Sequence, residues 1–286
     1  MVSVIERLKA VTHGVQERVV DRVKHHPIFI KQLTPENREK AEYVRHLLKL
    51  NPNLILVTGA NHGSDNDGPA LVQVTHQLMP DGMDDMYIMV SQGRSGSSPV
   101  FRKAVSVGNV FDTHPIPVVQ GKTFKNLKKR EKSIMKDTDE IAEEWVKVNQ
   151  DLRKTHETLN HLRSCGNSLA LGMLWEGTRR PNRILKPLSE GKGTGITADI
   201  GMLSPALVVP IALYPDDYSK TEKTSFGLYR LRAEIGYPMV SLSSDNPISY
   251  FDVMIQTAKL LPERYRGEWQ PLLEEWENPN LVGMHG

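Results

Sequence analysis

The chain has 286 residues, of which 39% are hydrophobic and 24% charged, and its formal net charge is +2. This composition is typical of a globular protein with enough residues for a substantial core, and the charge balance gives no indication of a nucleic-acid partner. The single cysteine, Cys165, excludes an internal disulfide and a cysteine-based metal site. No segment approaches the roughly 20 apolar residues of a membrane-spanning helix.

Residues 1–52 are predicted to form an N-terminal helical segment. Residues 3–24 place apolar side chains at helical spacing, which is typical of an amphipathic helix packed on the core or lying at a membrane interface. Thr34-Pro35-Glu36 combines a hydroxyl cap, an early proline and an acid, and predicts a helix to about Leu50. Asn51-Pro52 would end that helix, and residues 53–286 would form the second domain.

The apolar run Leu54–Val57 predicts a buried strand, and the turn-forming segment Asn61–Asp67 follows it. His62 and Asp67 are five positions apart, so they do not share one helix face and meet only if the chain folds back between them. A carboxylate can fix the tautomer of an imidazole and stabilise its cation, which makes the imidazole a general base. We therefore predict that His62 and Asp67 are catalytic; the structural alternative is that Asp67 caps the following helix.

The rest of the chain alternates between predicted strands and helices, which indicates an α/β fold with a mixed sheet covered by helices. Asp137 with Glu140 resembles a capping box, and the apolar spacing after it predicts a long inserted helix. Residues 192–196 predict a turn. The other predicted elements are a helix over Pro69–Leu78, strands over Met86–Val90, 105–111, 116–119 and Leu207–Leu213, and helices over Pro247–Leu261 and Glu268–Glu277.

A basic run, Lys122–Lys132, precedes the long helix. It is either a solvated surface or a docking site for an acidic partner. The residues that we assign to docking are Lys125, Lys128, Lys129 and Arg130.

A second strand-to-loop junction follows the long helix. The apolar run Leu169–Trp175 predicts a strand, and the loop after it carries an acid, a flexible glycine and two arginines. The planar fork of donors on arginine suits phosphate, whereas the structural alternative is an exposed basic turn in which the acid pairs with an arginine. The candidate binding residues are Glu176, Gly177, Thr178, Arg179 and Arg180.

Three segments resemble, in their order, the motifs of glycerolipid acyltransferases, the family of glycerol-3-phosphate and 1-acylglycerol-3-phosphate acyltransferases. His62-x4-Asp67 resembles the H-x4-D motif, Glu176-Gly177-Thr178-Arg179 matches the E-G-T-R core, and Val208–Ala212 looks like the fourth block. The resemblance covers about residues 54–213.

The chain departs from the family pattern at two places. Leu174-Trp175 stands where the family usually has Phe-Pro, and Gly108–Thr113 is only half of the second block, because it lacks the arginine. Arg94, Arg102 and Lys103 are candidates to replace that arginine.

The resemblance implies transfer of a fatty acyl group from a thioester, either acyl-CoA or an acyl carrier protein, to a hydroxyl of glycerol 3-phosphate or its 1-acyl derivative. His62 would be the general base, Asp67 would orient it, and Arg179 with Arg180 would hold the acceptor phosphate. No metal or redox cofactor is implied, because a thioester is already activated. We expect a cytoplasmic protein, peripheral at the inner face of the membrane, whose basic run docks the acyl donor or an anionic membrane surface.

Two other functions are compatible with the same residues. A degenerate acyltransferase fold could bind lipid or an acyl carrier without catalysis, and the missing second-block arginine favours that alternative. A thioester hydrolase could use His62 and Asp67 to activate water, although it would need no phosphate-binding arginines. The segment Val57-Thr58-Gly59-Ala60 resembles the nucleotide turn of short-chain dehydrogenases, but Asp65 stands where that turn requires glycine.

Overall fold

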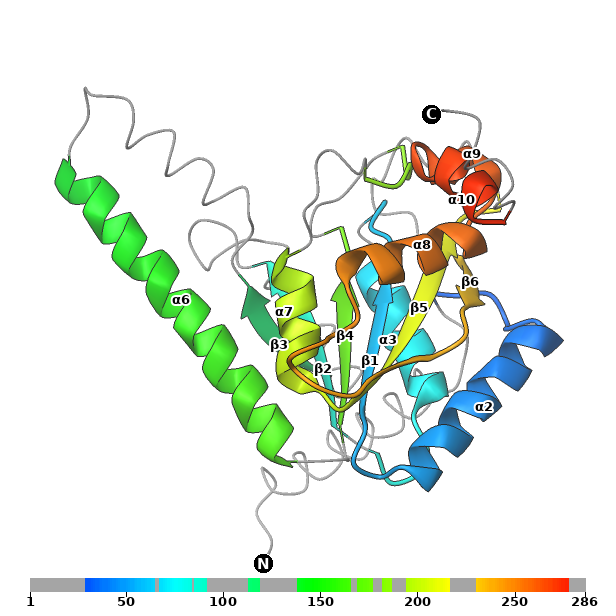
Figure 1. Ribbon diagram of the computed structural model, residues 1–286, viewed down its shortest axis with the longest axis horizontal. Coiled ribbons are helices and arrows are strands. Elements are labelled where there is room, and N and C mark those ends of the chain that lie inside the picture. Colours follow the sequence, from blue (N-terminus) through cyan, green and yellow to red (C-terminus); the bar gives the residue numbers. More distant parts are fainter. Residues whose placement is uncertain are drawn as a thin grey trace, which may run out of the picture.

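The computed structural model describes residues 29–64, 67–83, 85–91, 113–118, 138–165, 169–176, 182–186, 194–216 and 230–277. These residues form a seven-stranded sheet with helices on both faces (Figure 1). The predicted α/β fold with a mixed sheet is therefore confirmed.

The centre of the sheet is parallel. β1 (Ile55–Ala60) lies between β4 (Leu169–Leu174) and β5 (Ala206–Tyr214), and it runs parallel to both. β2 (Asp85–Ser91) lies between β4 and β3 (Thr113–Val118), again in parallel. β1 is buried at every position and β5 at all but its last residue, because helices cover both faces. This burial explains why both strands have nearly continuous apolar sequences.

The other edge of the sheet is antiparallel. β6 (Arg232–Ile235) and β7 (Met239–Ser241) both pair with β5 in this direction and make the sheet mixed. The side-chain amide of Asn37 accepts a hydrogen bond from a backbone N–H of β6 at 2.8 Å and donates one to a β6 carbonyl at 3.2 Å. Asn37 thereby satisfies backbone groups that an edge strand otherwise leaves unpaired.

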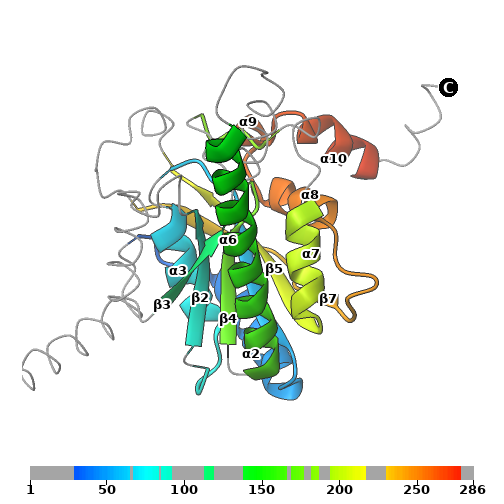
Figure 2. The same ribbon diagram turned by 90° about the vertical axis from the view of Figure 1, so that its left-hand side faces the viewer.

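Two layers of helices enclose the sheet (Figure 2). One layer packs on the buried face that Leu56 and Val209 share, and the other on the face of Val57 and Val208. None of the helices among the described residues is long and apolar enough to cross a membrane. The first layer consists of α2 (Pro35–Leu50) and α3 (Asp67–Leu78), and the second of α6 (Thr138–Cys165), α7 (Thr194–Leu203), α8 (Tyr250–Leu260), α9 (Glu263–Arg266) and α10 (Trp269–Glu277).

Local signals in the sequence identify two helices well. Thr34 caps α2 by accepting a hydrogen bond from the Asn37 backbone N–H, and Pro35 occupies the first helical position as predicted. The predicted inserted helix is confirmed as α6, which has 28 residues. The predicted helix over residues 3–24, the strand over 105–111 and the basic run all lie outside the described residues.

The predicted turn over residues 192–196 is wrong for its second half, because α7 begins at Thr194. Ile196, Ile200 and Leu203 follow each other at helical spacing and pack on the core, and this burial outweighs the glycine at position 195. β6 and β7 were not predicted, because both are short and expose part of their residues.

Packing explains why position 59 in β1 is a glycine. A Cβ atom at this position would lie 2.0 Å from the indole ring of Trp175, so the ring packs directly on the strand backbone. Trp175 is only 1% exposed. The glycine that suggested a nucleotide turn therefore makes room for a large core side chain.

We expect Gly59→Ala to destabilise the fold by roughly 1–3 kcal/mol, the usual range for overpacking, because the new methyl group would overlap the indole. Gly172→Ala in β4 is the matched control, since a Cβ there meets its nearest neighbour at an ordinary 3.4 Å. Chemical denaturation of both variants measures the difference. Equal stabilities of the two variants would contradict the packing assignment.

Candidate active site

The candidate residues lie at the carboxyl ends of adjacent parallel strands. Asn61 and His62 directly follow β1, and Trp175 and Glu176 directly follow β4. The Trp175 N–H donates a hydrogen bond of 2.9 Å to the Ala60 carbonyl, which continues the pairing of the two strands to this edge. Ligands of open α/β sheets bind outside the carboxyl ends of the strands, so this edge is the expected place for a site.

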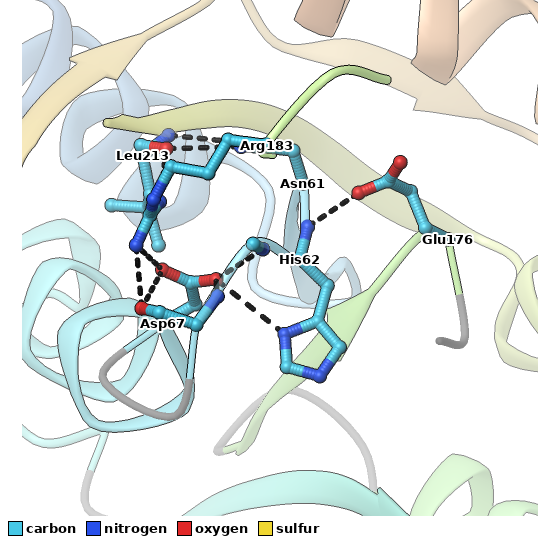
Figure 3. A network of polar contacts seen from close by, with 8 residues as sticks. Asn61, His62, Asp67, Glu176, Arg183 and Leu213 are labelled. Carbon is cyan, nitrogen blue, oxygen red and sulfur yellow. Dashed lines mark hydrogen bonds and ion pairs between the residues drawn. The ribbon is translucent and has the colours of Figure 1, made fainter. Parts of the chain in front are cut away.

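The chain after β1 folds back and brings His62 and Asp67 together. The His62 Nδ1 atom lies 3.5 Å from Asp67 Oδ2, which is longer than a normal N–H···O hydrogen bond. The Asp67 side chain is fully buried, whereas that of His62 is 21% exposed. The second ring nitrogen, Nε2, points away from Asp67 (Figure 3). A proton on Nδ1, facing the carboxylate, would leave Nε2 free to accept a proton from a substrate.

The Asp67 carboxylate is held by donors on both of its oxygens. Oδ2 accepts hydrogen bonds from the backbone N–H groups of Gly63 at 2.5 Å and Ser64 at 2.6 Å. Oδ1 accepts one from Ser64 Oγ at 2.9 Å and contacts Arg183 Nη2 at 3.1 Å. These donors precede Asp67 or come from Arg183. The bond from the Ser64 N–H to an acid three residues later is one that a capping box makes, so Asp67 supports the start of α3 as well as facing His62.

Arg183 is a site residue that the sequence analysis did not identify. Its side chain is fully buried, and besides Asp67 it contacts Ser64 Oγ at 2.5 Å and the Leu213 carbonyl at 3.2 Å. A Cβ atom at position 63 would lie 2.2 Å from Arg183 Cγ, so a glycine there permits the close approach. No local pattern marks this arginine as a buried one, because its partners Ser64 and Leu213 lie 119 and 30 residues away in the sequence.

Arg183 also determines the charge of Asp67. Burial by itself would raise the pKa of the Asp67 carboxyl, but the charge of Arg183 and the contacts with His62 and Ser64 outweigh it and lower that pKa. Asp67 is therefore ionised at neutral pH. An ionised partner is what an imidazole needs to be held in one tautomer.

Glu176 anchors the backbone of His62. One carboxylate oxygen of Glu176 accepts a hydrogen bond from the His62 N–H at 2.6 Å (Figure 3). The other oxygen accepts one from the Lys186 N–H, also at 2.6 Å. Glu176 is 4% exposed, so the alternative of an exposed acid paired with a neighbouring arginine is wrong for this residue. The carboxylate joins the loop after β1 to residues 182–186, and both of its oxygens bond to backbone.

Asn61 fixes the end of β1 against β5. Its side chain donates a hydrogen bond to the Leu213 carbonyl at 2.9 Å and accepts one from the Leu213 N–H at 2.8 Å. Arg183 donates to the same carbonyl. The backbone of Leu213 is therefore a common anchor for the loops that follow β1 and β4.

Within the described part of the chain, no three His, Cys, Asp or Glu side chains are grouped as a metal site requires.

Several predicted site residues belong to segments that the structure does not describe. The predicted residues that lie outside the described ranges are Gly177, Thr178, Arg179 and Arg180 of the binding loop, Lys125, Lys128, Lys129 and Arg130 of the basic run, and the candidates Arg94, Arg102 and Lys103 for the missing arginine.

Burial raises the pKa of Glu176 from 4.5 to about 7, even though two backbone N–H groups bond to it. The folded protein therefore holds this proton more tightly than the unfolded chain between these pH values. The free energy of unfolding should fall as pH rises from 4.5 to about 7 and then level off. Glu176→Gln should reduce this fall by roughly 1–3 kcal/mol.

Urea denaturation of the wild type and of Glu176→Gln between pH 4.5 and 8 measures how the free energy of unfolding of each protein depends on pH. Burial also raises the pKa of Asp199 to about 7, so Asp199→Asn is the matched control. It should remove its own share of the pH dependence and leave that of Glu176. If the wild-type and Glu176→Gln curves run parallel over this range, the Glu176 assignment is wrong.

A comparison of the sequence with protein-family models gives no match, and a comparison with curated proteins gives no significant match. The motif resemblance and the geometry of the site therefore carry the functional proposal.

Proposed function

We propose that the protein is a glycerolipid O-acyltransferase. It would move a fatty acyl group from the thioester of coenzyme A or an acyl carrier protein to a hydroxyl of glycerol 3-phosphate or its 1-acyl derivative. The observation that carries the proposal is the pair of His62 and Asp67 at the carboxyl end of β1, 3.5 Å apart, with a buried carboxylate and a partly exposed imidazole. The ordered H-x4-D and E-G-T-R motifs indicate which reaction this pair serves.

In the proposed reaction His62 Nε2 removes the proton of the acceptor hydroxyl as its oxygen attacks the thioester carbonyl. The C–S bond then breaks, and the leaving thiolate takes up the proton. Asp67 stabilises the transient imidazolium and keeps the ring in the required tautomer. Histidine–carboxylate contacts are often long in the absence of substrate, so a separation of 3.5 Å is compatible with this role.

Arg179 and Arg180 would bind the acceptor phosphate. Arginine offers several donors in a planar arrangement that matches phosphate oxygens. Binding the phosphate at one end of the acceptor would place its hydroxyl near His62, and this positioning supplies a large part of the rate enhancement of a two-substrate reaction. Glu176 supports the assignment indirectly, because it fixes the start of this loop against the His62 backbone.

The acidic donor would dock on the basic run Lys122–Lys132. Six of its eleven residues are basic and only Glu131 is acidic. Acyl carrier proteins, the phosphates of coenzyme A and anionic membranes all present negative charge to such a surface. A cytoplasmic enzyme, peripheral at the membrane, could reach its substrates in this way.

The deciding experiment combines two labelled donors, acyl-CoA and acyl carrier protein, with two acceptors, glycerol 3-phosphate and its 1-acyl form. Formation of acyl ester with at least one pair would support the proposal. Thioester loss that is independent of any acceptor indicates a hydrolase instead. Donor binding without product or hydrolysis indicates a non-catalytic binding module.

We expect His62→Ala to lower turnover by at least ~10²-fold, the usual range for loss of a general base, while the protein stays folded. His156→Ala is the matched control, because His156 is exposed on α6. The turnover of this variant should equal that of the wild type. Asp67→Asn is a poor probe, since it leaves Arg183 buried without its counter-charge. Near-normal turnover of folded His62→Ala would rule out the mechanism.

Arg179→Ala should raise the KM for the acceptor by about 10–100-fold, because one charge-assisted hydrogen bond to phosphate contributes roughly 1.5–3 kcal/mol. The KM for the donor should change little. Steady-state kinetics with each substrate varied in turn separates the two constants. A rise in the donor KM alone would assign Arg179 to the donor site.

A further inference from the structure

Arg183 is the centre of a buried polar cluster that joins three segments of the chain. Nη2 contacts Asp67 Oδ1 at 3.1 Å and Ser64 Oγ at 2.5 Å, and Nη1 donates to the Leu213 carbonyl at 3.2 Å. The side chains of Arg183 and Asp67 are both 0% exposed. The contacts therefore connect the loop after β1, the segment after β4 and the end of β5 without access to solvent (Figure 3).

The backbone of Arg183 has an unusual conformation. Its φ angle is 59°, in the left-handed region that residues other than glycine seldom adopt. Such a conformation persists when the surrounding structure imposes it, and it occurs often at functional sites. Here the following residues are held by hydrogen bonds from the Leu185 N–H to the Tyr265 carbonyl and from the Lys186 N–H to Glu176. The segment thus directs the guanidinium to the carboxylate.

The two oxygens of the Asp67 carboxylate face different partners. Oδ1 faces Arg183 and Ser64 Oγ, and this leaves Oδ2 to face the backbone N–H groups of Gly63 and Ser64 and the ring of His62. Arg183 does not itself approach the exposed side of the imidazole. Its effect on the reaction must pass through the carboxylate.

We propose that Arg183 is a positioning residue, which sets the orientation and the negative charge of Asp67 and thereby holds His62 with its proton on Nδ1. This inference rests on the proposed role of His62 as a general base. It goes beyond that role because it assigns a function to a residue outside the H-x4-D and E-G-T-R segments.

The alternative is a purely structural ion pair. Replacement of a buried ion pair often leaves stability unchanged, whereas removal of one partner leaves an uncompensated charge. A structural pair would therefore affect folding when Arg183 is replaced, but not the tautomer of His62 in the molecules that remain folded. The positioning role predicts that the tautomer changes.

The first test needs no substrate. Protein labelled with ¹⁵N-histidine is studied by NMR, and the His62 signals are identified from their loss in His62→Gln. We expect the wild type to hold the neutral ring with its proton on Nδ1, and Arg183→Met to show a mixture of tautomers or the proton on Nε2. Arg183→Lys keeps the charge but loses the two-pronged contact to Asp67 and Leu213, so it should show a smaller change of the tautomer in the same direction.

The second test measures acyl transfer. Arg183→Met should lower kcat by about 10- to 100-fold, the range known for residues that orient the histidine ligands of metal sites, with little change in either KM. The control is Asn37→Ala, which removes a buried side chain that bonds to β6 and does not contact the dyad. It should lower stability and leave the tautomer and kcat of the folded protein unchanged.

The outcomes separate this inference from the proposed function. A folded Arg183→Met that keeps the Nδ1 tautomer and wild-type kcat overturns the positioning role, as does an equal tautomer change in Asn37→Ala. If Arg183→Met does not fold, the same readouts on Arg183→Lys decide, because a lysine lacks the two-pronged contact to Asp67 and Leu213. If no donor and acceptor pair reacts with wild type, the acyltransferase proposal fails, while the tautomer still decides the role of Arg183.

Discussion

The buried ion pair between Asp67 and Arg183 is the interaction on which the rest of the site depends. Two charges leave water completely here, and such a pair is tolerated only if other hydrogen bonds complete its coordination. The backbone N–H groups of Gly63 and Ser64 and the Ser64 hydroxyl supply them to the carboxylate. The requirement accounts for the fold-back after β1, for the lack of a side chain at position 63 and for the left-handed backbone of Arg183.

Further side-chain contacts hold the segments that follow the strands at this edge of the sheet. The ends of three parallel strands are joined by side chains: Asn61 and Arg183 both bond to Leu213, and Glu176 bonds to the His62 N–H. Each strand is also paired with its neighbours in the sheet, and this pairing sets the register of the strand ends. In the proposed reaction these contacts would orient His62 before a substrate arrives, which is the condition for efficient positioning.

Glu176 shows that one motif can contain residues with different tasks. In the E-G-T-R segment the acid looks like part of a binding surface, yet its carboxylate lies buried and bonds to two backbone N–H groups. Its charge is costly at this place, because burial raises its pKa to about 7. Gly59 likewise resembles part of a nucleotide turn, but its lack of a side chain makes room for the indole of Trp175.

The sequence by itself determined the helices and strands that depend on local chemistry and on the spacing of apolar residues along the chain. The Thr34 cap, the apolar runs of β1, β4 and β5 and the spacing of α6 all have short-range causes, and so does the position of His62 and Asp67 after a strand. The tertiary structure alone decided that Asp67 faces His62 and that Glu176 is buried. It alone identified Arg183, because its partners are distant in sequence: Ser64 lies 119 residues away, and no local pattern encodes that contact.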